Sequence, residues 1–221
     1  MCYAVAMAAN HEISTADELW RTYRPVGKAS LDKEVTHLDA HCRDYIAHSP
    51  FVVLATTDGR GRVDTSPKGG PPGFVAVLDD HRCAIPDMAG NNRLDSLQNI
   101  LCCPSVSLLF LVPGVGETLR VVGAASISAD PAVLEHARVA GLRPNVAVVV
   151  EVVTAYLHCA KALRRSGLWS PESWPDTADM ASPACMMRDH MRLVESTEEM
   201  QAFLDRAYAE TTWAVGGQAE P

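Results

Sequence analysis

The sequence lacks the features that identify several large classes of protein. Aromatic residues make up only 6% of the 221 residues, so the core must be built mainly from aliphatic side chains. No apolar run approaches the length of about 20 residues that a membrane-spanning helix requires, and the run at residues 146–150 suits a strand. The weakly apolar residues 1–9 are not preceded by Lys or Arg, so we expect no signal peptide.

Basic residues are also in the minority, because 19 Lys and Arg stand against 27 Asp and Glu, giving a formal charge of -8. Nucleic acids and anionic membranes are bound through basic surfaces, so we expect neither as a partner. The seven cysteines are an odd number without Cys-x-x-Cys spacing. We therefore expect no disulfide framework and a reducing, cytoplasmic compartment.

Familiar catalytic motifs are missing too. There is no Gly-x-Ser-x-Gly, and Gly114-Val115-Gly116 has Leu119 where a dinucleotide fingerprint needs its third glycine, which favours a hairpin turn. His37 and His41 have the spacing of a helical zinc site, but Leu38 occupies the place of the general-base glutamate. We interpret this segment as a polar helix face and predict no metal site.

The chain is rich in closely spaced hairpins that only brief helices interrupt, a pattern typical of a mainly β, antiparallel barrel with helices. We expect an N-terminal extension at residues 1–30, a barrel domain at 31–169, and a helical extension at 170–221 packed on the barrel. The predicted strands cover residues 51–57, 62–66, 74–78, 82–85, 105–112, 118–128 and 146–157. The predicted helices cover residues 15–23, 32–48, 91–103, a segment from 130, 183–193 and 197–212.

One predicted helix begins at Asn91, after the chain breaks at Pro86 and Gly90. Helix N-termini attract anions, and Arg93 in the first turn opposes the usual acidic preference there, as expected if a phosphate supplies the negative charge. A second cationic turn is predicted at Ser66-Pro67-Lys68-Gly69-Gly70. The alternative interpretation is an ordinary Asn-capped helix with a solvated arginine.

A second informative segment runs from His158 to Trp169. His158, Lys161 and Arg165 have the spacing of one helix face, and Trp169 follows within reach. Cations and an indole plate suit an anionic, planar cofactor, although a solvated basic helix is the alternative.

Four further segments have to be considered together. They are Val63–Phe74, Ile85–Asp87 with Gly90–Asp95, Gly116–Val121, and His158–Leu163. Together and in this order, they resemble the FMN-binding split-barrel flavoproteins related to pyridoxamine 5'-phosphate oxidase. The likeness covers roughly residues 35–169 and is greatest to a bacterial FMN-dependent branch rather than to the oxidase itself.

The resemblance implies an antiparallel split β-barrel that forms a homodimer with FMN at the interface. It implies that Ser66 and Lys68 with Asn92 and Arg93 hold the phosphate, and that Asn91 and Leu94 are also cofactor-binding residues. Backbone around Asp64, Thr65, Pro86 and Asp87 would line the isoalloxazine ring. The partner subunit would supply His158, Lys161, Arg165 and Trp169, with His158 the leading candidate acid or base.

The sequence departs from the oxidase itself, because it lacks the C-terminal Arg-x-His signature and an acidic residue after Lys68-Gly69. We therefore do not expect oxidation of pyridoxamine 5'-phosphate. Three functions remain open. They are an FMN-dependent oxidoreductase acting on a small organic substrate, a split-barrel protein using a deazaflavin or haem, and a flavin-binding module without turnover.

Overall fold

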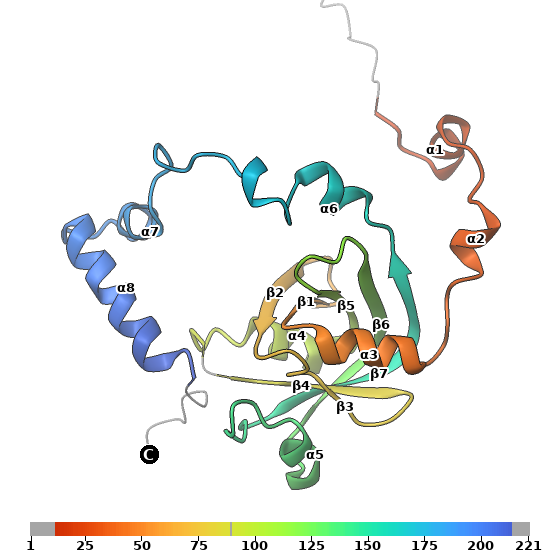
Figure 1. The fold of residues 1–221 in the computed structure, drawn as a ribbon, viewed down its shortest axis with the longest axis horizontal. Helices are drawn as coiled ribbons and strands as arrows, with labels where there is room; N and C mark the ends of the chain where they lie inside the picture. The colour runs from red at the N-terminus through yellow and green to blue at the C-terminus, as the bar shows by residue number, and fades with distance from the viewer. Residues whose placement is uncertain (1–11, 89, 214–221) are drawn as a thin grey trace, which may run out of the picture. The chain divides into compact units, whose positions relative to one another are not determined.

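The computed structural model describes residues 12–88 and 90–213 (Figure 1). Described residues up to Lys33 form one compact unit and those from Glu34 form a second. The first unit holds two short helices, α1 (Ala16–Thr22) and α2 (Lys28–Leu31). At α1 the Thr15 hydroxyl accepts from the Glu18 backbone N–H and the Glu18 carboxylate accepts from the Thr15 backbone N–H, a capping box that fixes where the helix begins.

The second unit is built on one antiparallel sheet of seven strands in the order β2-β1-β5-β6-β7-β4-β3 (Figure 1). The end strands β2 and β3 do not pair with each other, so the barrel is split. The predicted fold class is therefore confirmed. The strands are β1 (Phe51–Thr57), β2 (Val63–Gly69), β3 (Ala76–Val77), β4 (Arg82–Pro86), β5 (Ser105–Leu111), β6 (Thr118–Ser128) and β7 (Ala147–His158).

Strand alternation decides which side chains of β2 can reach the interior. In β1 every second residue is buried, as expected for a strand with one face on the core. The register pairs Val52 with Lys68, Leu54 with Ser66 and Thr56 with Asp64. Paired residues lie on the same face, so Asp64, Ser66 and Lys68 lie on the core side of the sheet.

The core is aliphatic, as the composition predicts. Phe110 is its only aromatic residue among the largest fully buried side chains of the described chain. The others are chiefly Leu, Ile and Val, led by Leu38, Ile46, Leu54, Ile85, Leu108, Val52, Val121, Val148 and Val150.

The helix predicted at residues 32–48 is wrong in its first half. Helix α3 (Ala40–His48) begins only after Asp39, whose side chain accepts a 2.8 Å hydrogen bond from the Cys42 backbone N–H. Val35 instead forms an isolated antiparallel bridge with Ala155 of β7. His37 therefore precedes the helix, and the predicted helical face with His41 does not exist.

The helix predicted at residues 91–103 also begins late. Asn92 and Leu94 have φ angles of +54° and +57°, and this left-handed conformation cannot be part of a right-handed helix. Helix α4 (Asp95–Cys102) follows and packs against β1, β2 and β6. The cationic turn predicted at residues 66–70 is wrong as well, because β2 continues to Gly69.

Most of the remaining helices are short, and α8 is the longest, with 15 residues. The first two after α4 are α5 (Pro131–His136) and α6 (Lys161–Ser166), and a 3₁₀ turn η1 (Pro171–Ser173) follows. Near the C-terminus, α7 (Pro183–Met191) and α8 (Thr197–Thr211) pack together around Ala184, Met200 and Leu204. Their packing on the barrel stays a prediction. Within the described ranges, no helix combines the length and apolar character needed to cross a membrane.

Strand β6 contains a bulge where it meets β7. The register shifts between Val122 and Gly123. A Cβ atom at Gly123 would lie 2.1 Å from the carbonyl oxygen of Glu151, so only glycine fits this close approach of two strands.

Candidate functional site

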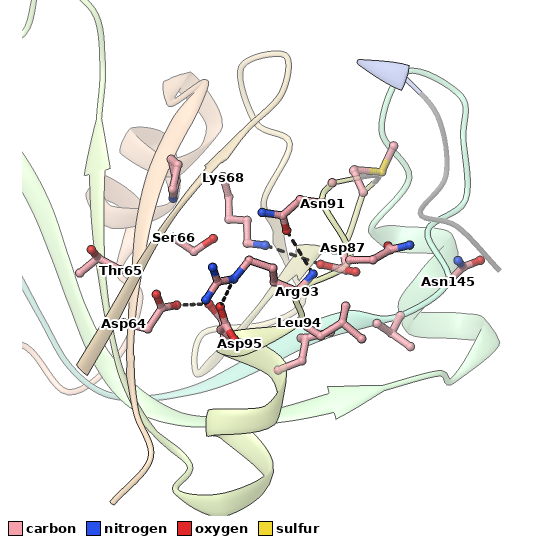
Figure 2. A pocket seen from close by; sticks show the side chains of 17 residues that line it. Asp64, Thr65, Ser66, Lys68, Asp87, Asn91, Arg93, Leu94, Asp95 and Asn145 are labelled. Atoms are coloured by element: carbon pink, nitrogen blue, oxygen red, sulfur yellow. Dashed lines mark hydrogen bonds and ion pairs between the residues drawn. The ribbon is translucent and has the colours of Figure 1, made fainter. Parts of the chain in front are cut away.

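A cavity of about 910 Å³ lies between β2, the segment that joins β4 to α4, and the start of β7 (Figure 2). We call it the larger cavity, and its size is typical of ligand pockets, which hold about 300–1,000 Å³. Its lining is polar along β2 and along the segment before α4. The lining residues are Asp64, Thr65, Ser66, Pro67, Lys68, Asp87, Met88, Gly90, Asn91, Asn92, Arg93, Leu94, Asp95, Ser96, Leu97, Asn145 and Val146.

Strand β2 supplies one wall (Figure 2). Asp64, Ser66 and Lys68 line it from the core side of the sheet, and the Lys68 side chain is 25% exposed. The Ser66 hydroxyl forms no hydrogen bond to another residue of the described chain. It can therefore donate to a ligand without losing an existing partner.

The segment before α4 supplies the opposite wall and is held in an unusual shape. The Asn91 side-chain oxygen accepts a 3.1 Å hydrogen bond from the Arg93 backbone N–H, and the Gln98 amide donates to the Arg93 carbonyl at 3.2 Å. Asn92 and Leu94 both occupy the left-handed region, which costs a non-glycine residue roughly 1–2 kcal/mol. Such strain clusters at ligand sites, because the surrounding structure must maintain it.

Four of the five charged groups of the cavity are already paired with one another. Arg93 Nε lies 2.7 Å from Asp95 Oδ2, and Lys68 Nζ lies 3.6 Å from Asp87 Oδ1. The remaining carboxylate, Asp64, accepts a 2.8 Å hydrogen bond from the Ser96 hydroxyl. Two cations thus face three carboxylates.

This pairing limits what the cavity can bind. The separation of 3.6 Å between Lys68 and Asp87 is too long for a hydrogen bond, so the ammonium group retains donors for a ligand. The Arg93 side chain is 71% exposed, so water screens its ion pair and leaves part of the guanidinium accessible. A phosphate fits these donors, but the carboxylates oppose it unless further cations approach.

Five predicted cofactor residues do not line this cavity. Pro86 ends β4 and pairs with Ala147. The other four are His158, Lys161, Arg165 and Trp169, which lie at the end of β7, in α6 and just beyond it. The resemblance assigns those four to a second subunit, so a single chain leaves that assignment as a prediction.

The helix face predicted from His158 to Arg165 is wrong in one respect. His158 is the last residue of β7 and pairs with Thr118, so it is not part of α6. Within α6 the Arg165 Nε donates to the Lys161 carbonyl at 3.1 Å. The Trp169 indole donates to the Val115 carbonyl at 2.9 Å, which ties the segment after α6 to the β5–β6 turn.

Sequence reasoning missed the far end of the larger cavity. Asn145 and Val146 line it because the Asp87 backbone N–H donates to the Val146 carbonyl at 3.0 Å. This contact extends the antiparallel pairing of β4 with β7. The two strands are far apart in sequence, so no local pattern could reveal the juxtaposition. Asp95 and Ser96 adjoin the predicted segment and were accessible to sequence reasoning.

Metal ligands do not gather anywhere in residues 12–88 and 90–213. No cluster of three or more His, Cys, Asp or Glu could hold an ion in that part of the chain. The ring of His37 lies beside that of His81, with centroids 6.1 Å apart.

Comparison with known proteins gave similar solved structures and one matching family. No curated protein matches the sequence. Similar solved structures include HupZ of Group A Streptococcus, at 18% identity and TM-score 0.44, covering 54% of this chain and 92% of that one. General Stress Protein 26 of Bacillus anthracis has 16% identity and TM-score 0.40, with coverages of 53% and 94%. An FMN-binding protein of Syntrophomonas wolfei has 12% identity and TM-score 0.41, with coverages of 52% and 82%.

The family evidence is in the sequence itself. The profile described as pyridoxamine 5'-phosphate oxidase matches residues 38–159, which is more than half of the chain. That range contains the sheet and every residue that lines the larger cavity. The chain therefore belongs to the pyridoxamine 5'-phosphate oxidase family.

Proposed function

We propose that the protein binds FMN in the larger cavity and is an FMN-dependent oxidoreductase acting on a small organic substrate. One observation carries the proposal. Ser66 and Lys68 on β2 and Arg93 before α4 are far apart in sequence but line one cavity of suitable size (Figure 2).

The residues of the cavity fit a flavin phosphate by their chemistry. Lys68 and Arg93 supply cationic donors, and the Ser66 hydroxyl and the Asn91 amide supply neutral ones. Bound FMN would supply electron transfer, and the chain would bind and orient it. The aliphatic core beneath β2 would keep water from that side of the site.

The proposal includes a homodimer, since the cavity needs more positive charge than one chain provides. Its side chains carry two cations and three carboxylates, whereas a phosphate monoester carries roughly -1.5 to -2 at neutral pH. A second copy that brings its His158, Lys161 and Arg165 to the cavity would reverse this balance. We propose His158 as the residue that exchanges a proton with the substrate.

The outer face of the sheet supports a second copy independently. Where an antiparallel sheet faces water, its outward residues are usually polar. Here the outward positions of β1 include Phe51, Val53 and Ala55, and the neighbouring strands add Leu109 and Val122. All five are only partly buried in one chain, so a symmetric partner that covered them would bury apolar surface.

The deciding experiment is a visible spectrum of the purified protein, with mass spectrometry of the released ligand. We expect the spectrum of an oxidised flavin and the mass of FMN. A haem or deazaflavin spectrum, or failure of added FMN to bind, would overturn the proposal.

Turnover is tested separately. Under anaerobic conditions NADPH or dithionite should bleach the bound flavin, and admitted air should restore its colour. Bound FMN that NADPH does not reduce and that turns over no organic acceptor would instead identify a non-catalytic flavin module. Pyridoxamine 5'-phosphate should be a poor substrate.

A further inference from the structure

A second, smaller cavity of about 380 Å³ adjoins the larger one and has no role in the function proposed above. It lies between the β1–β2 turn and α4, and shares Asp64, Arg93 and Asp95 with the larger cavity. Those three residues therefore form a common wall. Its remaining lining comes from Asp58, Arg60, Arg62, Val63, Gln98, Asn99 and Cys102.

The smaller cavity differs from the larger one in its balance of charge. It is lined by three arginines and three aspartates, whereas two cations face three carboxylates in the larger cavity. Arg60 and Arg62 act electrostatically on Asp58, but neither guanidinium forms a close ion pair or a hydrogen bond within the described ranges, in contrast to Arg93. Their planar donor groups are therefore available to a phosphate.

The nearest carboxylate in sequence is already engaged by backbone. Asp58 Oδ1 accepts hydrogen bonds from the backbone N–H groups of Arg60 and Arg62, at 2.7 Å and 3.1 Å. These bonds hold the pKa of Asp58 below its usual value, so the carboxylate is charged at neutral pH. The same hydrogen bonds hold the β1–β2 turn in a conformation in which Arg60 and Arg62 line the smaller cavity.

We propose that the smaller cavity binds a second phosphate, so that the site accepts the pyrophosphate of a flavin dinucleotide as well as the single phosphate of FMN. The inference rests on the proposed function, because the first phosphate is the one held by Lys68 and Arg93. Arg93 stands in the wall between the cavities, where it can contact both phosphates. Arg60 and Arg62 then bind the phosphate next to the adenosine.

The test measures binding of FMN and of FAD, by quenching of flavin fluorescence at fixed salt, to the full chain. FAD as well as FMN should bind the unaltered protein. Arg60→Ala/Arg62→Ala should weaken FAD by about 10- to 100-fold and change FMN less than about twofold. The control, Arg138→Ala/Arg206→Ala, removes the same charge elsewhere and should change neither.

Other results overturn the inference in distinguishable ways. If FAD affinity is unchanged in the double variant, or if FMN and FAD weaken equally, there is no separate second-phosphate site. If FMN binds the unaltered protein and FAD does not, the inference fails while the proposed function survives. If neither flavin binds, both fail.

Discussion

At the scale of single residues, the candidate site depends on side chains from segments that lie apart in sequence. Arg93 and Lys68 are both cations of the larger cavity, but they differ in their surroundings. The Arg93 side chain is 71% exposed and hydrogen-bonded to Asp95, whereas Lys68 is 25% exposed and more distant from Asp87. Removing either should affect ligand binding more than folding, because exposed ion pairs contribute little to stability.

We predict that Arg93→Ala weakens FMN binding and leaves the fold intact. A charge-assisted contact to phosphate contributes roughly 1.5–3 kcal/mol, or about 10- to more than 100-fold in affinity. Lys68→Ala should act in the same direction. Flavin fluorescence titration with circular dichroism measures both effects, and Arg138→Ala, just beyond α5, is a matched control. Unchanged FMN affinity in both variants would exclude these residues from the phosphate site.

Part of the lining of the larger cavity could be predicted from sequence, but its local geometry could not. The Asn91–Leu94 segment stood out because an arginine follows two asparagines where a helix starts. The left-handed conformations at Asn92 and Leu94 were not predictable, since leucine rarely adopts them and tertiary contacts impose them here. The carboxylates that pair with Lys68 and Arg93 were visible in sequence, but their distances to the cations were not.

At the scale of elements, turn signals and alternation predicted most strands, while helix starts were placed badly. Hydrophobic spacing predicted a helix from residue 32, whereas the helix begins only at Ala40. The helix begins after Asp39 because the side chain of this residue accepts a hydrogen bond from the Cys42 N–H, which would otherwise lack a partner. The pairing of Val35 with Ala155 joins residues far apart in sequence, so local hydrophobic spacing cannot predict it.

We predict that Asp39→Ala lowers the free energy of unfolding by about 1 kcal/mol at neutral pH through loss of the helix cap. The hydrogen bond from Cys42 N–H holds the pKa of Asp39 below its usual 3.8. The stabilisation is therefore complete above that value and disappears as the pH falls through the lower folded-state pKa. Urea unfolding of both proteins from pH 7 down to pH 3 should show their stabilities converging. A constant difference would contradict the assignment.

We predict that Gly123→Ala destabilises the sheet. The added Cβ would meet the Glu151 carbonyl, and the two strands would have to separate. Overpacking of this kind costs roughly 1–3 kcal/mol or more. Thermal unfolding measures the loss, and Gly27→Ala is the control because its Cβ would meet nothing within 4 Å. Equal melting temperatures for the two variants would mean that the bulge can relax.

At the scale of the whole molecule, the cysteines differ in how far solvent can reach them. Cys83 is fully buried and burial raises its pKa to about 12, while that of Cys42 rises to about 11, again chiefly from burial. Cys102 and Cys159 are exposed in the single chain. Cys102 is the last residue of α4.

We predict that an alkylating reagent at pH 8 labels Cys102 rapidly and labels Cys42 and Cys83 only after denaturation. Cys159 adjoins His158, so in a dimer it should be labelled more slowly than Cys102 despite its exposure in one chain. Peptide mass spectrometry at timed intervals measures the order, with light scattering to establish the oligomeric state. Rapid labelling of Cys159 in a stable dimer would place the interface elsewhere.

The position of β2 at the end of the sheet order leaves one side of this strand unpaired among the described residues. β2 pairs only with β1, so one side of the strand offers backbone groups to any extended chain that approaches. Val63 in the same strand is 73% exposed, and this apolar side chain favours association with another chain. Pro67 lacks an N–H and interrupts the row, a common safeguard of edge strands. A ligand in the larger cavity would contact β2 and hold this strand in place. We therefore expect the protein without ligand to aggregate more readily than the protein with ligand.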